Sequence, residues 1–247
     1  MRIDILTLFP DMIGAVLGES VTGRALKKNL FELNLVDIRN YTLDKHRRVD
    51  DYPYGGGDGM VMQAEPVYNA YSAVKSDKSR FFYLTPHGKT FNQEMAKELS
   101  KEEHLIFLCG HYEGIDQRVI DILEPEEISL GDFILTGGEL AVMPVCDSIL
   151  RLLPGVLGNE TSMVEESFEN GLLEYPQYTR PEEFMELKVP EVLLSGHHKN
   201  IENWRFEKSL EFTLKKRPDL IEKAVFTKNE QEILEKIKKS LAKEEMV

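Results

Sequence analysis

Hydrophobic residues in the first part of the chain come in short runs that alternate with helical patterns. The run Ile3–Leu8 predicts a strand, and the spacing over Asp11–Leu17 predicts a helix directly after it. The alternation of Phe31, Leu33 and Leu35 predicts a second strand. Strands that alternate with helices are typical of an α/β fold built on a mainly parallel sheet.

Three later segments repeat one order, in which an apolar strand leads into a glycine-containing turn and then into a helix. The strands are expected at Phe81–Thr85, Leu105–Cys109 and Ile128–Leu135, the turns at PHGKT, GHYEG and TGGE, and the helices near Asn92–Leu99, Gln117–Leu123 and Pro144–Leu153. Pro144 is expected in the first turn of its helix, where a missing N–H costs little. Each turn alone is explained by the tight bend that glycine allows. Because open α/β sheets bind ligands at the carboxyl ends of their strands, three such turns in succession favour one shared pocket.

The pattern changes after Pro154. Residues 158–171 are polar and acidic with few apolar anchors, which is typical of a linker. Beyond them the periodicity is helical, and Asn229 with Glu232 predicts the capped start of a helix. The predicted organisation is an α/β domain over 1–157, a flexible linker over 158–171 and a small α-helical domain over 172–247.

The composition is that of an ordinary globular protein, with 42% hydrophobic and 30% charged residues. No apolar run approaches the roughly 18–20 residues that span a membrane, and the first residues do not match a secretory signal. Cys109 and Cys146 are far apart and outside any CxxC spacing, which speaks against a disulfide framework and a structural zinc site. We therefore expect a cytoplasmic protein.

The familiar nucleotide and metal motifs are incomplete in this chain. Gly88-Lys89-Thr90 resembles the end of a phosphate-binding loop, but Tyr83 occupies the position of the first glycine of that motif. No GxGxxG follows a strand with an acidic residue about 20 positions later, and no two histidines have the HExxH spacing. A protein metal site is therefore not expected.

A basic segment precedes a glycine-rich one. Residues 39–48 hold four Lys or Arg side chains against one Asp, although the whole chain has a net charge of −13. Four glycines follow within residues 55–59, and glycine lets a backbone come close to a ligand. A flexible surface loop explains the glycines equally well. The adjoining positive charge favours a nucleic-acid backbone as the partner.

A second basic cluster, at residues 215–217, has a simpler explanation. Phe206, Leu210 and Leu214 form a helical stripe that Pro218 ends. Cations in the last turn of a helix complement its dipole, so this cluster does not by itself predict a binding site.

Longer motifs run along nearly the whole chain in the order found in one family. They are LTLFPDM, DKHRRVDDYPYGGGDGMV, LTPHG, CGHYEGIDQRV, SLGDFILTGGELA, LPGVLGN, EESFENGLLEYPQYTRP and VPEVLLSGHH. In these motifs the chain resembles the bacterial tRNA (guanine-N1)-methyltransferases of the SPOUT class. The resemblance implies methyl transfer from S-adenosylmethionine to N1 of guanine 37, the base 3′ of the anticodon, in a tRNA with G36 and G37. It also implies a homodimer, a deep trefoil knot and support of the reaction by Mg²⁺, with no DNA or membrane partner.

The resemblance also carries individual roles onto residues of this chain. The cofactor pocket would be lined by Tyr83, Leu84, Thr85, Pro86, Gly88, Gly110, Tyr112, Glu113, Gly114, Ser129, Leu130, Gly131, Asp132, Phe133, Ile134, Leu135, Gly137 and Gly138. The tRNA would be contacted by Lys45, His46, Arg47, Asp50, Gly55, Gly56, Gly57 and Gly59. Arg151 stands just before the PGVLG segment, where the family has its base-pocket arginine. Glu166 stands before Ser-Phe, where the family usually has an aspartate as the general base.

The chemistry of the implied reaction suits these residue types. Guanine N1 carries a proton, and a carboxylate such as Glu166 can remove it from within hydrogen-bond reach. Negative charge then builds on guanine O6, which a guanidinium such as Arg151 stabilises, while Glu113 would suit a cationic sulfonium. Without the resemblance, Arg151 is explained as an exposed cation at a helix end and Glu166 as a solvated linker acid. Asp50 and Glu165 are the next candidates for the base.

Two functions of other classes remain open on the sequence. A tRNA-binding or chaperone-like module could keep the fold without catalysis, and the glutamate in place of the usual aspartate favours it. An α/β enzyme acting on a small nucleotide metabolite would agree with the negative net charge. Formation of a methylated tRNA separates both from the methyltransferase.

Overall fold

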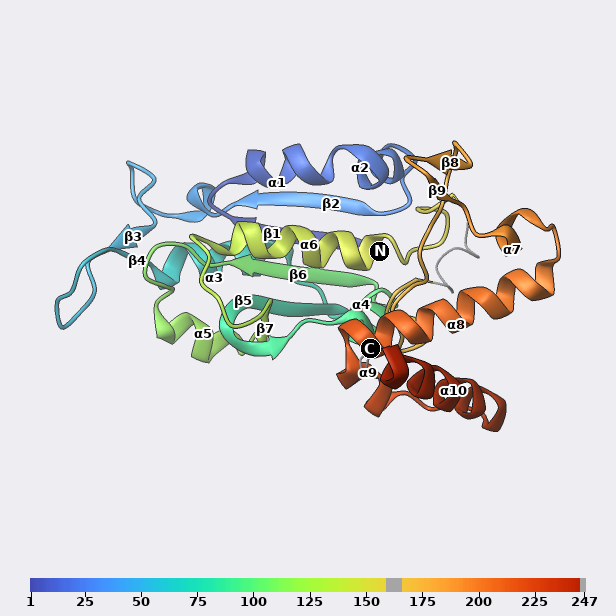
Figure 1. Cartoon of the computed structure of the whole chain (residues 1–247). Coiled ribbons are helices and arrows are strands. Elements are labelled where there is room, and N and C mark those ends of the chain that lie inside the picture. The colour runs from blue at the N-terminus through green and yellow to red at the C-terminus, as the bar shows by residue number, and fades with distance from the viewer. Residues whose placement is uncertain (159–165, 245–247) are drawn as a thin grey trace. The chain divides into compact units, whose positions relative to one another are not determined.

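In a computed structural model, which describes residues 1–158 and 166–244, the chain divides into two compact units, Met1–Gly158 and Asn159–Val247 (Figure 1). The first unit is built on a five-stranded sheet in the order β2-β1-β6-β5-β7, with every neighbouring pair parallel. Its strands are β1 (Arg2–Thr7), β2 (Glu32–Asp37), β5 (Ser79–Thr90), β6 (His104–Cys109) and β7 (Glu126–Ser129). The predicted α/β class with a parallel sheet is confirmed.

Helices cover both faces of this sheet. One hydrophobic core contains Ile3 and Ile5 of β1, and the other contains Leu6, so successive side chains of the strand are buried on opposite faces. Burial on both faces explains why the strands are continuous apolar runs. The first face packs against α1 (Pro10–Leu17), α2 (Ser20–Lys27), α4 (Gln93–Leu99) and α6 (Gly138–Leu150), and the second against α3 (Ala64–Val74) and α5 (Gln117–Leu123).

The connection from β2 to α3 carries three short elements. They are a 3₁₀ helix, η1 (Ile38–Tyr41), and an antiparallel pair formed by β3 (Asp50–Asp51) and β4 (Val61–Met62). The glycine-rich segment predicted from the sequence joins β3 to β4, so it projects from the first unit as a hairpin-like loop (Figure 1).

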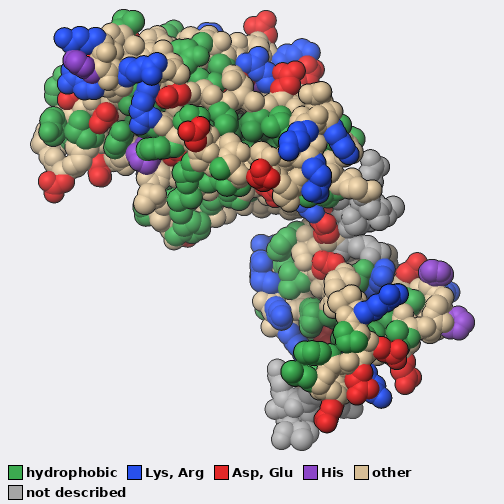
Figure 2. Space-filling model, turned by 90° about the horizontal axis from the view of Figure 1, so that it is seen from above, with side chains coloured by type: hydrophobic (Ala, Val, Ile, Leu, Met, Phe, Trp, Pro, Cys, Tyr) green, Lys and Arg blue, Asp and Glu red, His purple; other side chains and the backbone are tan. Residues whose placement is uncertain are grey.

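Hydrophobic side chains reach the surface on the outer side of α1. Phe9, Met12 and Val16 are exposed there, and Leu140 of α6 is exposed as well. Figure 2, which looks onto the α1 and α2 side of the first unit, shows hydrophobic side chains exposed among polar ones. An exposed apolar face of this kind is typical of a surface that another molecule covers.

The structure corrects two of the predicted boundaries in the strands. β5 continues through PHGKT to Thr90, because Lys89 and Thr90 pair with Ile128 and Ser129 after a register shift, so the turn predicted there is wrong. β7 ends at Ser129 instead of Leu135, and residues 130–137 form an irregular loop. The strand was predicted too long because the apolar residues of that loop have the sequence pattern of a buried strand.

The last helix of the first unit also starts elsewhere than predicted. α6 begins at Gly138, six residues before Pro144, which lies inside the helix. Proline there removes one backbone hydrogen bond. Burial of Val142, Val145 and Ile149 against the sheet outweighs this loss, since all three side chains are fully buried.

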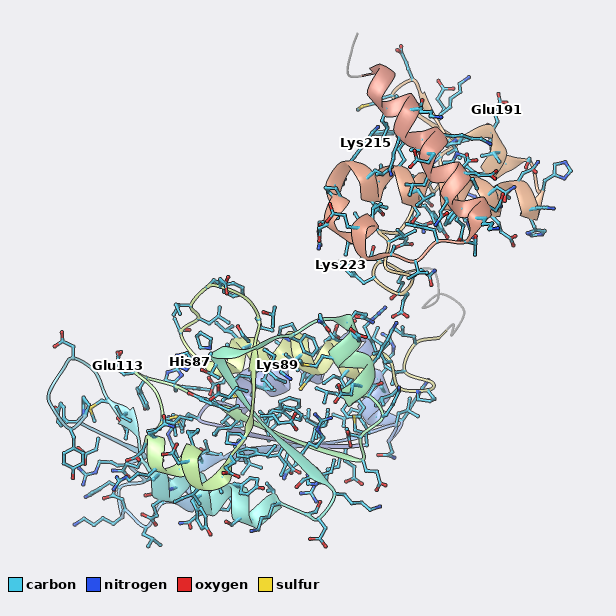
Figure 3. All side chains as sticks on the ribbon, turned by 90° about the horizontal axis from the view of Figure 1, so that it is seen from below. His87, Lys89, Glu113, Glu191, Lys215 and Lys223 are labelled. Carbon is cyan, nitrogen blue, oxygen red and sulfur yellow. The ribbon has the colours of Figure 1, made fainter. Side chains whose placement is uncertain are left out.

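Gly88 lies where β5 passes directly over the backbone of β7. A Cβ atom at this position would lie 2.3 Å from the Ile128 nitrogen and 2.4 Å from the Glu127 carbonyl carbon. Its neighbours His87 and Lys89 are labelled in Figure 3. Because both obstructing atoms belong to the backbone, no side-chain rotation can make room.

Gly88→Ala is therefore expected to destabilise the first unit by about 1–3 kcal/mol, the usual cost of overpacking. Gly158→Ala is a matched control, because nothing lies within 4 Å of a Cβ added there. Denaturant unfolding of both variants measures the difference. Equal stability of the two variants would contradict the close passage of β5 over β7.

The second unit is mainly helical. It contains α7 (Glu191–Leu194), α8 (His198–Lys216), α9 (Pro218–Lys223) and α10 (Lys228–Glu244), with a short hairpin of β8 (Glu183–Phe184) and β9 (Leu187–Lys188) that the sequence analysis did not predict. Leu172, Leu210 and Leu234 form its buried core. The predicted apolar stripe of α8 is confirmed, since Phe206 and Leu214 pack against this core.

The start of α10 differs from the prediction. Thr227 and Glu230 form the capping box: the Thr227 backbone N–H donates to Glu230 Oε2 at 2.7 Å, and the Glu230 N–H donates to Thr227 Oγ1 at 3.4 Å. The pair Asn229 and Glu232 lies two residues too late, although its spacing is the same. Spacing alone cannot choose between two overlapping boxes.

Half of the predicted linker, residues 159–165 with the candidate Glu165, lies outside the described residues. Its last part, 166–171, forms turns that belong to the second unit. Within residues 1–158 and 166–244, no helix combines the length and the hydropathy needed to cross a bilayer.

Candidate functional site

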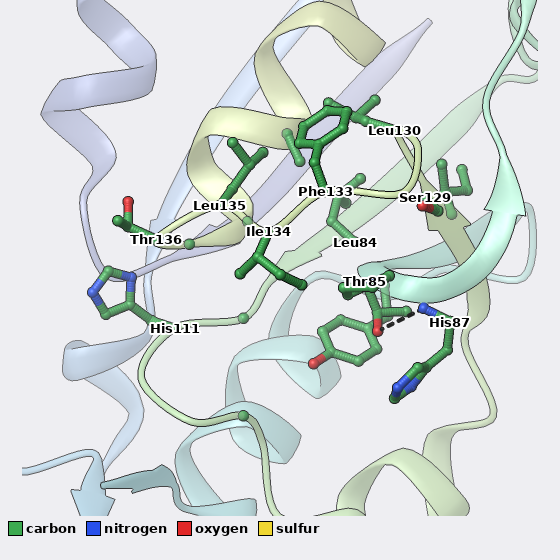
Figure 4. A pocket seen from close by; sticks show the side chains of 18 of the residues that line it. Leu84, Thr85, His87, His111, Ser129, Leu130, Phe133, Ile134, Leu135 and Thr136 are labelled. Carbon is green, nitrogen blue, oxygen red and sulfur yellow. Dashed lines mark hydrogen bonds between the residues drawn. The ribbon is translucent and has the colours of Figure 1, made fainter. Parts of the chain in front are cut away.

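A cavity of about 370 Å³ lies between the middle of β5, the loop after β6 and the loop after β7 (Figure 4). Cofactor-sized ligands occupy cavities of roughly 300–1,000 Å³. The predicted cofactor residues that line it are Tyr83, Leu84, Thr85, Pro86, Gly110, Tyr112, Glu113, Gly114, Ser129, Leu130, Gly131, Phe133, Ile134, Leu135, Gly137 and Gly138. The three segments therefore meet at one place.

Two predicted cofactor residues do not line this cavity. Gly88 faces the backbone of β7, as described above, and Asp132 is exposed in the 130–137 loop without lining the cavity. The lining also includes five residues that the sequence analysis did not select, namely His87, His111, Ile128, Thr136 and Ala141. His111 and Thr136 lie inside the predicted turns, so their sequence positions could have indicated them. Ala141 could not be found without the true start of α6.

The 130–137 loop supplies an apolar wall to the cavity. Phe133 is 54% exposed and Ile134 is 81% exposed, although both are large hydrophobic side chains. Figure 4 shows Ile134 between His111 and Thr85. The turn that starts the loop is closed by Ser129, whose Oγ accepts from the Gly131 N–H at 3.1 Å. Exposed apolar side chains at a cavity suit a ligand with a flat, apolar part.

Glu139 ties the surrounding segments together. Its carboxylate is buried and accepts hydrogen bonds from Thr7 Oγ1 at 2.8 Å and from the Leu8 N–H at 3.3 Å. The other carboxylate oxygen lies 3.5 Å from His111 Nδ1. The end of β1 and the start of α6 are thus joined through one side chain, and the loop after β6 lies beside it; the importance of Glu139 was not predicted from the sequence.

Gly138 allows the same segments to come close together. Its N–H donates to the Gly110 carbonyl oxygen at 2.7 Å, and an added Cβ would lie 2.7 Å from Cys109 Cα. α6 can therefore begin directly over the end of β6 only with glycine at this position.

Burial keeps Tyr83, which lines the cavity, and two cysteines of the core in their neutral forms. Burial raises the pKa of the Tyr83 hydroxyl, with a further contribution from the charge of Glu127. Burial likewise raises the pKa of both Cys109 and Cys146, which are unpaired thiols in the core. Neither cysteine is a reactive thiolate, since that form needs a lowered pKa.

The glycine-rich loop is connected to the cavity. Gly55, Gly56, Gly57 and Gly59 all have positive φ, from 78° to 128°, which explains the glycine run. A Cβ at Gly59 would lie 2.6 Å from Glu113 Cγ. Just beyond it, the Glu113 N–H donates to the Met60 carbonyl oxygen at 3.0 Å. Glu113 lines the cavity, so one end of this loop is fixed against the cavity wall (Figure 3).

The basic segment before β3 exposes most of its charge. Lys45, His46 and Arg47 are exposed, and Asp50 is half-buried in β3. Asp44 accepts from the His46 N–H at 2.7 Å and pairs with Arg48 at 3.2 Å. The hydrogen bond from Arg48 lowers the pKa of Asp44, so this carboxylate stays charged and partly neutralises Arg48.

The two predicted catalytic residues belong to different units. Arg151 is half-buried and follows the last residue of α6 in the first unit. Glu166 is half-buried in the second unit, where it lines a cavity of about 450 Å³ together with Tyr175, Arg205 and Ser209. The Arg205 guanidinium lies 4.8 Å from the centre of the Tyr175 ring.

In the part of the chain that the structure describes, no group of three or more His, Cys, Asp or Glu side chains could hold a metal ion.

The whole sequence is similar to proteins of one family. A family model described as tRNA (Guanine-1)-methyltransferase TrmD matches residues 1–223. A tRNA (guanine-N(1)-)-methyltransferase from Clostridium beijerinckii is 62% identical over 235 residues, which cover 95% of this chain and 98% of the relative. Relatives of the same name from Clostridium tetani and Ruminiclostridium cellulolyticum are each 58% identical and cover 94% and 90% of this chain, and 97% of their own length.

Proposed function

The chain belongs to the tRNA (guanine-N1)-methyltransferase family, and from this premise we propose that it transfers a methyl group from S-adenosylmethionine to N1 of guanine 37. It is a methyltransferase, so a binding module without catalysis no longer explains it. The observation that carries the finer proposal is the cavity of about 370 Å³ on which three chain segments converge. The tRNA named for its relatives disfavours a small metabolite as substrate.

The residues of this cavity fit S-adenosylmethionine. Leu84, Ile134 and Leu135 provide apolar surface for an adenine ring, and Glu113 provides a negative charge for a sulfonium. Glycine at position 110 lets the Tyr83 ring pack against the backbone, because an added Cβ would lie 3.0 Å from that ring. When bound, the cofactor supplies the methyl group as an electrophile.

The reacting guanine needs two functions from the protein. Glu166 takes the proton from N1, which turns the nitrogen into a nucleophile. Arg151 stabilises the negative charge that develops on O6. A base inside a stacked anticodon loop is not accessible to them, so guanine 37 must leave the stack, with G36 beside it.

The basic segment and the glycine loop are proposed to bind the tRNA backbone. The residues are Lys45, His46, Arg47, Asp50, Gly55, Gly56, Gly57 and Gly59, all in the connection that ends against Glu113. Exposed cations beside a loop with unhindered backbone suit phosphate groups.

Lys45→Ala is expected to weaken tRNA binding and to reduce the slope of log K against log salt by about 1. Affinity for S-adenosylmethionine should stay unchanged, because Lys45 does not line the cavity. Lys101→Ala is the matched control, since it removes the same charge from an exposed site at the amino-terminal side of β6. An equal change of slope in both variants would contradict a specific role of the segment.

Further properties of the family complete the proposal. A homodimer would cover the exposed apolar side chains on and directly before α1, Phe9, Met12 and Val16, and Leu140 of α6. A trefoil knot is proposed from the resemblance to the family alone. We also propose a cytoplasmic location and support of the reaction by Mg²⁺.

The proposed donor and substrate class can be tested together. Purified protein is incubated with S-adenosylmethionine carrying a labelled methyl group and either tRNA with G36 and G37 or free guanosine nucleotides. We expect label in the tRNA alone. Label in the nucleotides, or no transfer when calorimetry shows that the donor is bound, would contradict the proposal.

A further inference from the structure

Leu173, in the segment that carries Glu166, makes two hydrogen bonds to α8. The Leu173 N–H donates to Thr213 Oγ1 at 2.9 Å, and Ser209 Oγ donates to the Leu173 carbonyl oxygen at 2.5 Å. The two hydroxyls are four residues apart on α8 and therefore lie on the same face of the helix. Both backbone groups of Leu173 are thus held by one helix.

The hydrogen bond from Leu173 to Thr213 is fixed in direction. Thr213 is fully buried, and its Oγ1 donates its single proton to the Ser209 carbonyl oxygen at 2.7 Å. The oxygen can therefore act only as an acceptor toward Leu173. Loss of this acceptor would leave the N–H of the half-buried Leu173 without its partner on α8, which is unfavourable.

Hydrogen bonds within a closed turn connect Leu173 to the residues that follow Glu166. The Glu174 N–H donates to Ser167 Oγ at 3.0 Å, and the Phe168 N–H donates to the Leu172 carbonyl oxygen at 2.8 Å. Residues 167 and 168 are thereby joined to the residues on both sides of Leu173. Glu166 comes directly before this closed turn.

The same helix face also borders the cavity of Glu166. Ser209 and Glu166 both line the cavity of about 450 Å³ in the second unit. Leu172, directly before Leu173, is buried in the core with Leu210 of α8. Packing alone would require only an apolar side chain at position 213, and valine has nearly the same shape as threonine. The buried hydroxyl therefore points to a role in fixing the turn.

We propose that Thr213 and Ser209 are positioning residues, which hold the 166–174 turn on α8 so that the Glu166 carboxylate is presented in one place. The proposal rests on the proposed function of Glu166 as the base. Thr213 is fully buried and lines neither of the two cavities, so its hydroxyl acts through the position of Glu166. A displacement of about 1 Å in a catalytic group can lower a rate by about 100-fold.

The test compares Thr213→Val, which keeps the shape and removes the acceptor, with Thr213→Ser, which keeps the hydroxyl. Single-turnover rates are measured with saturating donor and tRNA, in the native chain and in Glu166→Gln. We expect Thr213→Val to lower the rate by about 10–100-fold, Thr213→Ser to restore it, and donor affinity to stay constant. In Glu166→Gln, Thr213→Val should cause no further loss, because the two changes act on one group.

The outcomes separate this inference from the proposed base. A native rate of Thr213→Val, or an equal loss of rate in the native chain and in Glu166→Gln, overturns the inference. The proposed role of Glu166 as the base still holds in that case if Glu166→Gln is slow. A native rate of Glu166→Gln overturns both. Ser209→Ala, which removes only the donor to the Leu173 carbonyl, gives the same comparison if Thr213→Val does not fold.

Discussion

Glu166→Gln is expected to lower kcat for methyl transfer by about 100- to 10,000-fold, the range over which a positioned general base accelerates a reaction. The amide keeps the shape of the side chain but cannot accept the N1 proton. Affinity for S-adenosylmethionine should not change, since Glu166 belongs to the second unit and the proposed donor cavity to the first. Single-turnover kinetics with isothermal titration of the donor measure both quantities.

Two variants control for indirect effects at this position. Glu169→Gln changes the same functional group in the same turn, outside the lining of the Glu166 cavity, and should keep a near-native rate. Glu166→Asp restores the residue type usual in the family and should retain most of the activity. A near-native rate of Glu166→Gln would place the base elsewhere, with Asp50 and Glu165 as the candidates.

Arg151→Met is expected to lower kcat by about 100- to 1,000-fold, the usual cost of removing one group that stabilises a developing oxyanion. Methionine keeps much of the length of the chain but has no charge and no donor. The donor cavity does not include Arg151, so the dissociation constant of S-adenosylmethionine should stay constant. Arg151→Lys keeps the charge but not the planar guanidinium. Its kcat should lie between that of the native protein and that of Arg151→Met.

The control for Arg151 is a similar change at an arginine without a proposed role. Arg24 is exposed on α2, and Arg24→Met should leave kcat near the native value. Thermal unfolding of both variants measures any loss of stability at the end of α6. An unchanged kcat in Arg151→Met, with a weaker donor affinity, would contradict a role of Arg151 at the guanine.

Local signals predicted the starts of α4 and α5, each of which follows a capping residue that stands alone in the sequence. α5 begins after Asp116, whose carboxylate accepts from the Arg118 N–H at 3.0 Å, and it spans the predicted Gln117–Leu123. α4 begins after Asn92 in the same way. A side chain that caps a helix lies within three residues of its partner, so the sequence alone contains the signal.

Elements shaped by the cavity could not be predicted in the same way. Phe133, Ile134 and Leu135 have the pattern of a buried strand, but they form an exposed loop because they line a cavity. The role of Glu139 depends on Thr7, which is 132 residues away in the sequence. Contacts of this kind exist only after the chain has folded.

The identity of the product tests the account most directly. Native protein, labelled donor and a tRNA with G36 and G37 are incubated together, and the tRNA is digested to fragments and nucleosides for mass analysis. We predict labelled 1-methylguanosine in the fragment that contains position 37, and none from a tRNA with A37. Label on another atom or at another position would contradict the account.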